Sequence, residues 1–248
     1  MERPRVLVVA GYDPSGGAGV LADVKTLEAH AVYGYAVCTA MTFQNERVIR
    51  RVDWLPETSV FEQIDVCFDA AGFDWVKMGI TDSTEAAGSI IRHLKQHNPS
   101  VRVVWDPVIR ASSGTDFWRK TAGWEEVAAQ CYLMTPNWEE MGWLYADGDV
   151  LERCRMLTTQ SGCRVFLKGG HHPEHPGRDY LFAGGAVQVL EPVGGLAVHP
   201  KHGSGCVLAS ALTANLALER PLSEAAAKAK EYVERFLSSN KSLLGWHQ

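Results

Sequence analysis

Several features that would place the chain in a familiar class are absent from it. The six cysteines, at positions 38, 67, 131, 154, 163 and 206, form no CxxC pair, a pattern more typical of reduced thiols than of a disulfide framework. No apolar run approaches the ~18 residues of a membrane span, and the run near the N-terminus is too short for a signal peptide. The net charge of −5 lacks the basic excess typical of nucleic-acid-binding proteins. We therefore expect a cytoplasmic protein with no membrane or nucleic-acid partner.

The common nucleotide-binding motifs are missing as well. A Walker A loop ends in Gly-Lys, and no Gly-Lys pair occurs in the chain. The stretch "GSGCVL" has Leu208 where the last glycine of a GxGxxG motif would stand. The HRD and DFG elements of protein kinases do not occur. These three nucleotide-binding classes are therefore excluded.

What the chain does contain is typical of an α/β protein. Its 248 residues are 46% hydrophobic and 21% charged, which is enough for a sizeable core. There is no internal repeat, low-complexity segment or Pro/Ser-rich linker, so we expect a single domain over residues 1–248.

Short apolar runs alternate with segments of helical periodicity. The runs predict strands at 5–11, 35–41, 74–79, 101–106, 131–135 and 164–170. The periodic segments predict helices at 17–31, 59–70, 83–97, 137–146, 149–162, 205–218 and 223–239, with Ser83 as an N-cap. Gly184-Gly185 turns a hairpin. Repeated βα units predict a mostly parallel central sheet with helices on both faces.

Ligands of such sheets bind at loops beyond the carboxyl ends of the strands. The stretch "HGSGCVL" places Gly203, Ser204 and Gly205 directly before a helix, where free backbone N–H groups and the helix dipole favour an anion such as phosphate. An ordinary N-terminal turn is the alternative. Cys206 follows in the first helical turn, where its pKa can be lowered toward a thiolate; a small buried hydrophobic side chain is the alternative.

Polar residues end three other predicted strands. Asn137 and Glu140 lie one helical turn apart and together suit the water shell of Mg²⁺, and the same spacing fits a capping box. Asp106 ends a buried strand before a proline. Lys168 ends another strand and could neutralise a phosphoryl group in transfer.

A histidine-rich segment offers a weaker signal. His171, His172 and His175 have the spacing HHxxH, but the surrounding glycines and prolines predict a loop. A zinc-binding HExxH motif needs its histidines on one face of a helix. The sequence therefore does not favour a metal site at this position.

Taken together, the motifs resemble one known family. The stretch "GYDPSGGAGVLADVKT" is similar to the first signature of the hydroxymethylpyrimidine and phosphomethylpyrimidine kinases of thiamine biosynthesis, which have the ribokinase-like three-layer α/β/α fold. The later motifs follow in the family's order: "TAMTFQN", "VKMG", "DPVIRASSG", "TPNWEE", "KGGH" and "HGSGC". The resemblance covers essentially the whole chain.

The resemblance implies a phosphoryl transfer from ATP, with Mg²⁺, to the hydroxymethyl group of 4-amino-5-hydroxymethyl-2-methylpyrimidine and to the resulting monophosphate. It implies that Cys206 takes the hydroxyl proton, that Gly203, Ser204 and Gly205 form an anion hole, and that Lys168 assists. ATP and Mg²⁺ would be bound by Asp106, Thr135, Asn137 and Glu140, with Glu140 holding the metal through water. It also implies a homodimer.

Substrate recognition is assigned in the same way. Gln44 would hold the pyrimidine, and its carboxamide presents the donor and acceptor pair that complements an aminopyrimidine edge. The resemblance adds four residues lining the ring pocket: Gly11, Ala18, Met78 and Val108.

The chain departs from the family pattern in three places. Pro200-Lys201 precede the anion turn, Phe43 is bulkier than the usual neighbour of Gln44, and the chain ends at "SLLGWHQ" without a longer tail. These departures bear on the second phosphorylation, not on the kinase class. The alternatives are a pyridoxal kinase on the same scaffold, which the glutamine at position 44 disfavours, and a non-catalytic binding protein, which the intact polar set disfavours.

Overall fold

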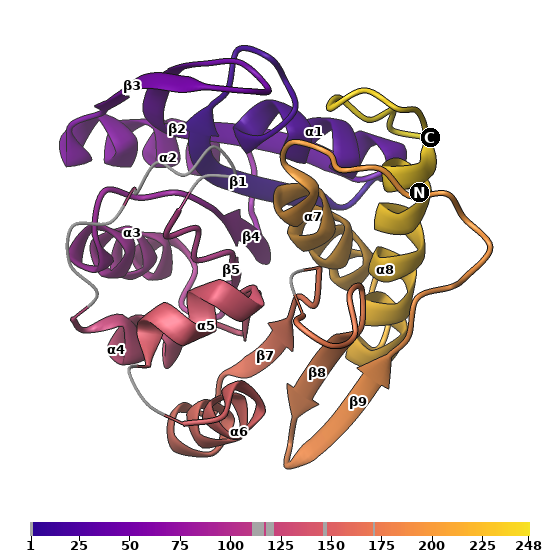
Figure 1. Ribbon diagram of the computed structural model, residues 1–248. Helices are drawn as coiled ribbons and strands as arrows, with labels where there is room; N and C mark the ends of the chain where they lie inside the picture. The colour runs from indigo at the N-terminus through magenta and orange to yellow at the C-terminus, as the bar shows by residue number, and fades with distance from the viewer. Residues whose placement is uncertain (1, 111–116, 118–121, 146–147, 171) are drawn as a thin grey trace.

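The computed structural model describes residues 2–110, 117, 122–145, 148–170 and 172–248. Its centre is a nine-stranded sheet in the order β3-β2-β1-β4-β5-β6-β7-β8-β9 (Figure 1). Six neighbouring strands run parallel, and β3, β8 and β9 are antiparallel to their neighbours. The predicted mostly parallel sheet is therefore confirmed.

The strands are short except at the N-terminal end of the chain. Their bounds are β1 Arg5–Tyr12, β2 Tyr33–Gln44, β3 Ile49–Trp54, β4 Trp75–Met78, β5 Arg102–Trp105, β6 Leu133–Met134, β7 Arg164–Leu167, β8 Asp179–Ala183 and β9 Ala186–Leu190. The predicted hairpin is β8–β9, and Gly184 and Gly185 both have positive φ at its turn.

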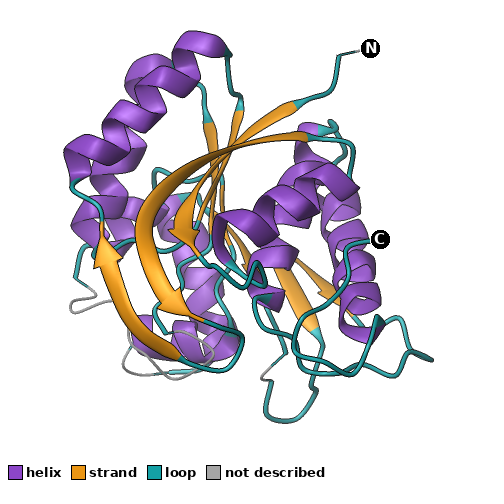
Figure 2. Ribbon diagram, turned by 90° about the horizontal axis from the view of Figure 1, so that it is seen from above, coloured by secondary structure: helices purple, strands orange, loops and turns teal. Residues whose placement is uncertain are grey.

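Helices cover both faces of the sheet (Figure 2). One face carries α1 Gly19–Ala29, α7 Ser204–Ala217 and α8 Leu222–Ser238. The other carries α2 Glu57–Ala70, α3 Thr84–His97, α4 Trp124–Ala128, α5 Trp138–Leu144 and α6 Val150–Ser161. The two apolar cores lie between these helical layers and the sheet, which gives the three-layer α/β/α architecture.

The strand β1 is apolar from Val6 to Ala10 because both of its faces are buried. Val6, Val8 and Ala10 pack into one core, and Leu7 and Val9 pack into the other. A strand with helices on both faces has no solvent side, so it lacks the alternation of an amphipathic strand. The carboxyl end of this strand opens directly into the Gly-rich loop before α1.

A long ribbon extends beyond the parallel part of the sheet. The sequence predicts a strand at 35–41, but β2 runs on to Gln44 and pairs with β3 from Ala40. The strand β3 has no sequence-based prediction, because Arg50, Arg51 and Asp53 interrupt its apolar residues. The second half of β2 and β3 are called the β2–β3 ribbon below.

Helix ends follow the expected capping chemistry. The side chain of Ser83 accepts a hydrogen bond from the Ala86 N–H, which confirms the predicted N-cap of α3. Asn137 and Glu140 form a complete capping box at α5. The helix predicted at 137–146 ends earlier, at Leu144, and residue 146 lies outside the described residues. No described helix is both long enough and apolar enough to cross a membrane.

Candidate active site

The Gly-rich loop between β1 and α1 is organised around Asp13. This carboxylate is buried and accepts hydrogen bonds from the Ser15 hydroxyl, the backbone N–H groups of Ser15 and Ala18, and His202 Nε2 at 2.8 Å. Burial acts to raise the pKa of Asp13, but the hydrogen bonds from His202 and Ser15 outweigh it and lower the pKa. Asp13 therefore ties the first loop to the loop before α7, although the two are almost 190 residues apart in sequence.

The same two loops touch through their backbones. Gly203 has φ +74°, and a Cβ on it would lie 2.0 Å from the Gly17 carbonyl oxygen and 2.8 Å from Ala18 Cα. Any side chain at this position would push the loops apart. The predicted anion turn and the predicted pocket residue Ala18 are thus held in contact.

Lys168 brings the polar strand ends together. Its Nζ lies 2.6 Å from Asp106 Oδ1 and 3.8 Å from Glu140 Oε2. A Cβ on Gly205 would lie 3.2 Å from this nitrogen, so the amine faces the first turn of α7. Thr135 also donates to Asp106 Oδ1, at 3.1 Å. Sequence reasoning named all five residues from four separate loops, and the fold gathers them at one place.

Burial and neighbouring charges together set the pKa values in this cluster. Burial acts to lower the pKa of Lys168, but the carboxylates of Asp106 and Glu140 raise it. The pKa of Asp106 is lowered, because Lys168 and Lys77 outweigh the effect of its own burial. Burial raises the pKa of Glu140 to about 7, because the nearby Lys168 offsets only part of the cost of burying its charge. The lysine is therefore held as a cation beside a glutamate that can lose or gain a proton near neutral pH.

Cys206 lies at the N-terminus of α7. The sequence leaves two interpretations open there, a thiol with a lowered pKa and a small buried hydrophobic side chain. In the structure, burial raises the pKa of the thiol to about 11, and the nearby Lys77 offsets only part of that rise. Asp23 and Asp106 oppose a second anion at this position. Cys206 is thus a protonated thiol at neutral pH, although it does lie in the first turn of α7.

Two charged residues that interact with Cys206, Lys77 and Asp23, were not predicted from the sequence. Lys77, in β4, forms a fully buried ion pair with Asp23 at 2.8 Å. Ser210, in α7, donates to the other oxygen of Asp23 at 2.7 Å. The signal was a lysine in the otherwise apolar strand "WVKM", because a buried amine requires a counterion.

Gln44 is the predicted pyrimidine-binding residue that lines an open groove, and Gly11, Ala18, Met78 and Val108 are not among the residues lining it. Gln44 lies at the end of the β2–β3 ribbon and lines a groove of about 580 Å³ together with Tyr12 and Pro14 of the first loop. Its buried Oε1 has no hydrogen-bond partner among the described residues.

The other predicted pocket residues differ in their exposure. Met78 is fully buried in the core, and Val108 is half-buried. Gly11 is covered by Ile80, whose Cδ1 would lie 2.3 Å from a Cβ added there. Sequence order alone does not show that Ile80 lies in front of Gly11.

The unusual segment before the anion turn packs against the C-terminal tail. Lys201 is buried, and its Nζ donates to the Asn240 carbonyl oxygen at 2.5 Å. The backbone of His202 bonds Leu243 at 2.9 Å. Lys201 therefore anchors the loop to the tail.

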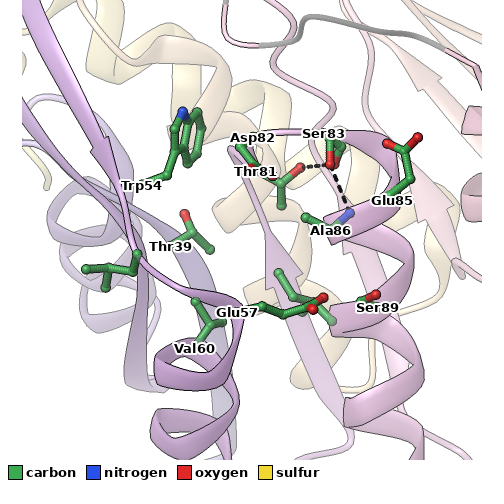
Figure 3. A pocket seen from close by; sticks show the side chains of 12 residues that line it. Thr39, Trp54, Glu57, Val60, Thr81, Asp82, Ser83, Glu85, Ala86 and Ser89 are labelled. Carbon is green, nitrogen blue, oxygen red and sulfur yellow. Dashed lines mark hydrogen bonds between the residues drawn. The ribbon is translucent and has the colours of Figure 1, made fainter.

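A separate pocket of about 280 Å³ lies between β2, β3 and the start of α3 (Figure 3). Trp54 and Thr39 line one side of it, and none of the residues predicted to bind ATP, Mg²⁺ or the acceptor, or to act in catalysis, lines it. The Thr81 hydroxyl donates to the Ser83 carbonyl oxygen, and the Ser83 hydroxyl caps α3. These polar atoms serve the turn into the helix.

The histidine-rich segment forms a turn. Nδ1 of His172 accepts hydrogen bonds from the backbone N–H groups of Glu174 and His175, and its ring packs on Trp138. His171 lies outside the described residues.

The six cysteines are all free thiols, as predicted.

Comparison with known proteins identifies the class first. A phosphomethylpyrimidine kinase from Clostridium difficile 630 superposes with a TM-score of 0.76 at 30% identity, over 93% of this chain and 98% of that one. A pyridoxal kinase from Staphylococcus aureus, solved with AMP-PCP, superposes with a TM-score of 0.83 at 24% identity over 98% and 91% of the two chains. The fold is therefore that of the ribokinase-like kinases.

Sequence comparison identifies the family. The phosphomethylpyrimidine kinase family matches residues 13–247. A hydroxymethylpyrimidine/phosphomethylpyrimidine kinase from Staphylococcus aureus is 33% identical over 94% of this chain and 88% of its own length. The corresponding protein of Escherichia coli K12 is 32% identical, over 86% and 83%. This chain belongs to the phosphomethylpyrimidine kinase family, as its motifs predict, and it is a kinase.

Proposed function

We propose that this kinase transfers the γ-phosphoryl group of ATP to the hydroxymethyl group of 4-amino-5-hydroxymethyl-2-methylpyrimidine, and then phosphorylates the monophosphate. Family membership supports the substrate class. The observation that carries the chemistry is the approach of the Lys168 amine to Gly205 at the first turn of α7. A fixed cation and free backbone N–H groups there suit a phosphoryl group in transfer.

The residues that would hold ATP and Mg²⁺ fit those groups. Asp106 Oδ2 is a buried carboxylate oxygen without a hydrogen-bond partner among the described residues, and Glu140 offers a second carboxylate nearby. Hard oxygen donors of this kind suit Mg²⁺, which retains several waters. Glu140 would hold the ion through water, with Thr135 and Asn137 flanking the nucleotide. Bound Mg²⁺ would neutralise phosphate charge.

The chain's own residues would act mainly by positioning. The N–H groups at Gly203, Ser204 and Gly205 hold the moving phosphoryl oxygens, and Lys168 balances their charge. Phosphoryl transfer through a loose transition state makes little demand on a base. We infer that Cys206 acts as a neutral thiol that accepts a hydrogen bond from the substrate hydroxyl, whose proton leaves through an oxygen of the transferred phosphoryl group to water, so removal of Cys206 would slow turnover without abolishing it.

Substrate choice would rest on Gln44. Its unpartnered Oε1 and its amide group offer an acceptor and a donor side by side, as an aminopyrimidine requires. A pyridoxal kinase remains the second candidate, because pyridoxal kinases share the fold. The glutamine favours the pyrimidine.

We also propose a cytoplasmic homodimer built from one domain per chain. The support is the β2–β3 ribbon and its turn, where Met41 and Phe43 of β2 and Val48 of the turn are 40%, 45% and 44% exposed. Apolar side chains grouped on an exposed ribbon are typical of an interface.

One assay separates the candidates. ADP release is measured with the hydroxymethylpyrimidine, its monophosphate, pyridoxal or no acceptor, in the native chain and in Gln44→Ala. We expect release with the first two acceptors. In Gln44→Ala, KM for the pyrimidine rises about tenfold or more, as for the ~1–3 kcal/mol of a bidentate contact. Turnover with pyridoxal alone would overturn the assignment, and no turnover with any acceptor would favour a binding protein.

A further inference from the structure

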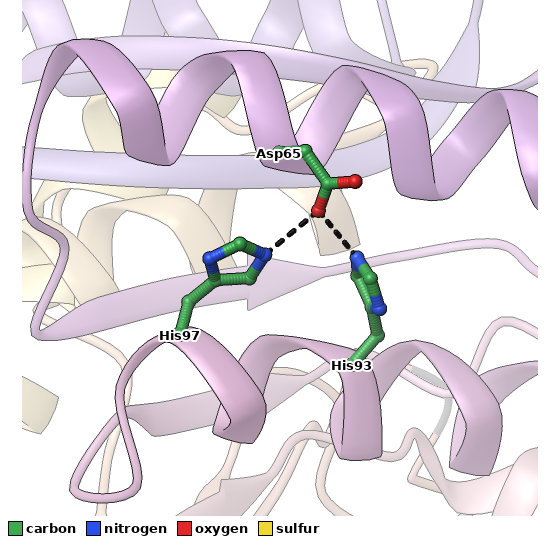
Figure 4. A group of neighbouring side chains, drawn as sticks. All are labelled: Asp65, His93 and His97. Atoms are coloured by element: carbon green, nitrogen blue, oxygen red, sulfur yellow. Dashed lines mark hydrogen bonds and ion pairs between the residues drawn. The ribbon is translucent and has the colours of Figure 1, made fainter.

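A cluster of metal-binding side chains lies far from the proposed kinase site in the fold. Asp65 projects from α2, and His93 and His97 project from the neighbouring helix α3 (Figure 4). Asp65 Oδ1 lies 2.6 Å from His93 Nε2 and 2.7 Å from His97 Nε2. Among the described residues, this is the one group of three or more His, Cys, Asp and Glu whose ligand atoms all lie within 4.8 Å of one another.

The spacing on α3 suits a shared ligand. His93 and His97 are four residues apart, so their side chains lie on one face of the helix. Two histidines at this spacing on a helix are a common zinc-binding element. The carboxylate from the adjacent helix supplies a third donor, which gives the two-histidine, one-carboxylate set found with first-row transition ions.

The two imidazole rings are held in place by aromatic stacking. His93 stacks on Phe61 with 4.2 Å between ring centroids and 13° between planes. His97 stacks on Phe68 at 4.7 Å and 12°. Both phenylalanines lie on α2, beside Asp65. Ligand orientation is thus fixed by packing before any ion arrives, which reduces the entropy lost on binding.

The geometry needs only a small adjustment. Bonds of about 2.0–2.1 Å at tetrahedral angles place ligand atoms about 3.3 Å apart. Asp65 Oδ1 now lies 2.6 and 2.7 Å from the two Nε2 atoms, so it must move away from each by about 0.7 Å, within reach of side-chain rotation. The two Nε2 atoms lie within 4.8 Å of each other. An ion would replace the protons on the two Nε2 atoms, and each neutral ring would carry its proton on Nδ1.

We propose that Asp65, His93 and His97 form a binding site for a divalent first-row transition ion such as Zn²⁺, which links α2 to α3. The side chains of His93, His97 and Asp65 are 17%, 28% and 46% exposed, so the ion reaches the site from solvent and keeps at least one open position.

The test titrates Co²⁺, as a spectroscopic stand-in for Zn²⁺, into the full chain without nucleotide or acceptor. We expect one equivalent to bind with a d–d absorption spectrum and no thiolate charge-transfer band, and Zn²⁺ to displace it. A Zn²⁺ concentration about 100 times Kd should raise Tm by about 5–10 °C. EDTA should reverse the shift.

Three variants and one control locate the site. His93→Gln and His97→Gln should each weaken Co²⁺ binding by about 100-fold, since each removes a ligand. Asp65→Asn keeps a hydrogen-bond acceptor for the two histidines. If Asp65 only links α2 to α3 by hydrogen bonds, this variant should leave stability unchanged, whereas it should weaken Co²⁺ binding. His175→Gln alters the other histidine-rich segment and should leave the affinity unchanged.

Several results would overturn the proposal. They are unchanged affinity in both histidine variants, loss of binding in His175→Gln, or a thiolate band in the cobalt spectrum. Asp65→Asn with native affinity would also contradict it. None of these measurements uses kinase activity, so the metal site and the proposed reaction can fail independently.

Discussion

Two buried lysines stand in contrasting surroundings within the same sheet. Lys77 pairs with Asp23, and both oxygens of that aspartate have partners, from Lys77 and from Ser210. Lys168 pairs with Asp106, whose second oxygen has no partner among the described residues. Lys77 is fully enclosed, whereas Lys168 faces the first turn of α7. A satisfied pair stabilises the fold, and an incompletely satisfied pair is available to a ligand.

The largest effect is expected from breaking the enclosed pair. Lys77→Met leaves the Asp23 carboxylate buried without a counterion, so the free energy of unfolding should fall by about 3–5 kcal/mol. Urea denaturation followed by circular dichroism measures this change. The double variant Lys77→Met/Asp23→Asn should regain part of the loss, because it leaves no buried charge. If the free energy of unfolding of Lys77→Met falls by less than about 1 kcal/mol, the Lys77–Asp23 pair does not stabilise the fold and the contrast with Lys168–Asp106 is wrong.

The open pair should affect turnover more than folding. Lys168→Met removes the cation at the first turn of α7, and kcat should fall by about 10²–10³-fold, as when one oxyanion donor is lost. Its free energy of unfolding should fall less than that of Lys77→Met, because Lys77 also compensates the charge of the Asp106 carboxylate. Steady-state ADP release and the same urea assay test both points. Lys168→Arg, which keeps the charge, serves as the control, and an unchanged kcat in Lys168→Met would contradict the proposed role.

A third effect concerns pH. Glu140 has a pKa of about 7 in the folded protein against an ordinary value of 4.5. Between these two values the folded state keeps a proton that the unfolded state has lost, so stability falls as pH rises through this window. The fall is on the order of 1 kcal/mol per pKa unit.

Glu140→Gln isolates that contribution. Glutamine can still complete the capping box with Asn137, but it does not titrate. The difference in unfolding free energy between the native chain and this variant, measured from about pH 4 to about pH 9.5, should change across the window and be flat above about pH 8. A flat difference throughout would show that Glu140 keeps its ordinary pKa.

Much of the site could be predicted because its residues end strands. Lys168 and Asp106 follow buried strands, and a parallel sheet brings such positions to one edge. Asn137 and Glu140 were recognisable from their spacing alone. The ribbon strand β3 could not be predicted, because its charged residues hide the apolar pattern and its pairing with β2 is a long-range contact. Helix α4 was missed because five residues carry too little periodicity.

The protonation state of Cys206 shows the limit of local reasoning. Its place in the first turn of α7 left a lowered pKa and a buried neutral thiol both open, and desolvation together with two nearby carboxylates raises the pKa. Those carboxylates come from distant parts of the chain, so no window of sequence around Cys206 contains them. The same holds for Asp65, His93 and His97, which the sequence does not bring together.

The order of strands and helices, the motifs of the family and the anion turn "HGSGC" were determined by the sequence itself, because periodicity, capping and glycine placement act over a few residues. The tertiary structure alone decided which charges meet. It enclosed Lys77 with Asp23, left Asp106 incompletely satisfied and raised the pKa of a thiol that the helix would otherwise lower. Desolvation and Coulomb interactions depend on distances in space, and only the folded chain sets those distances.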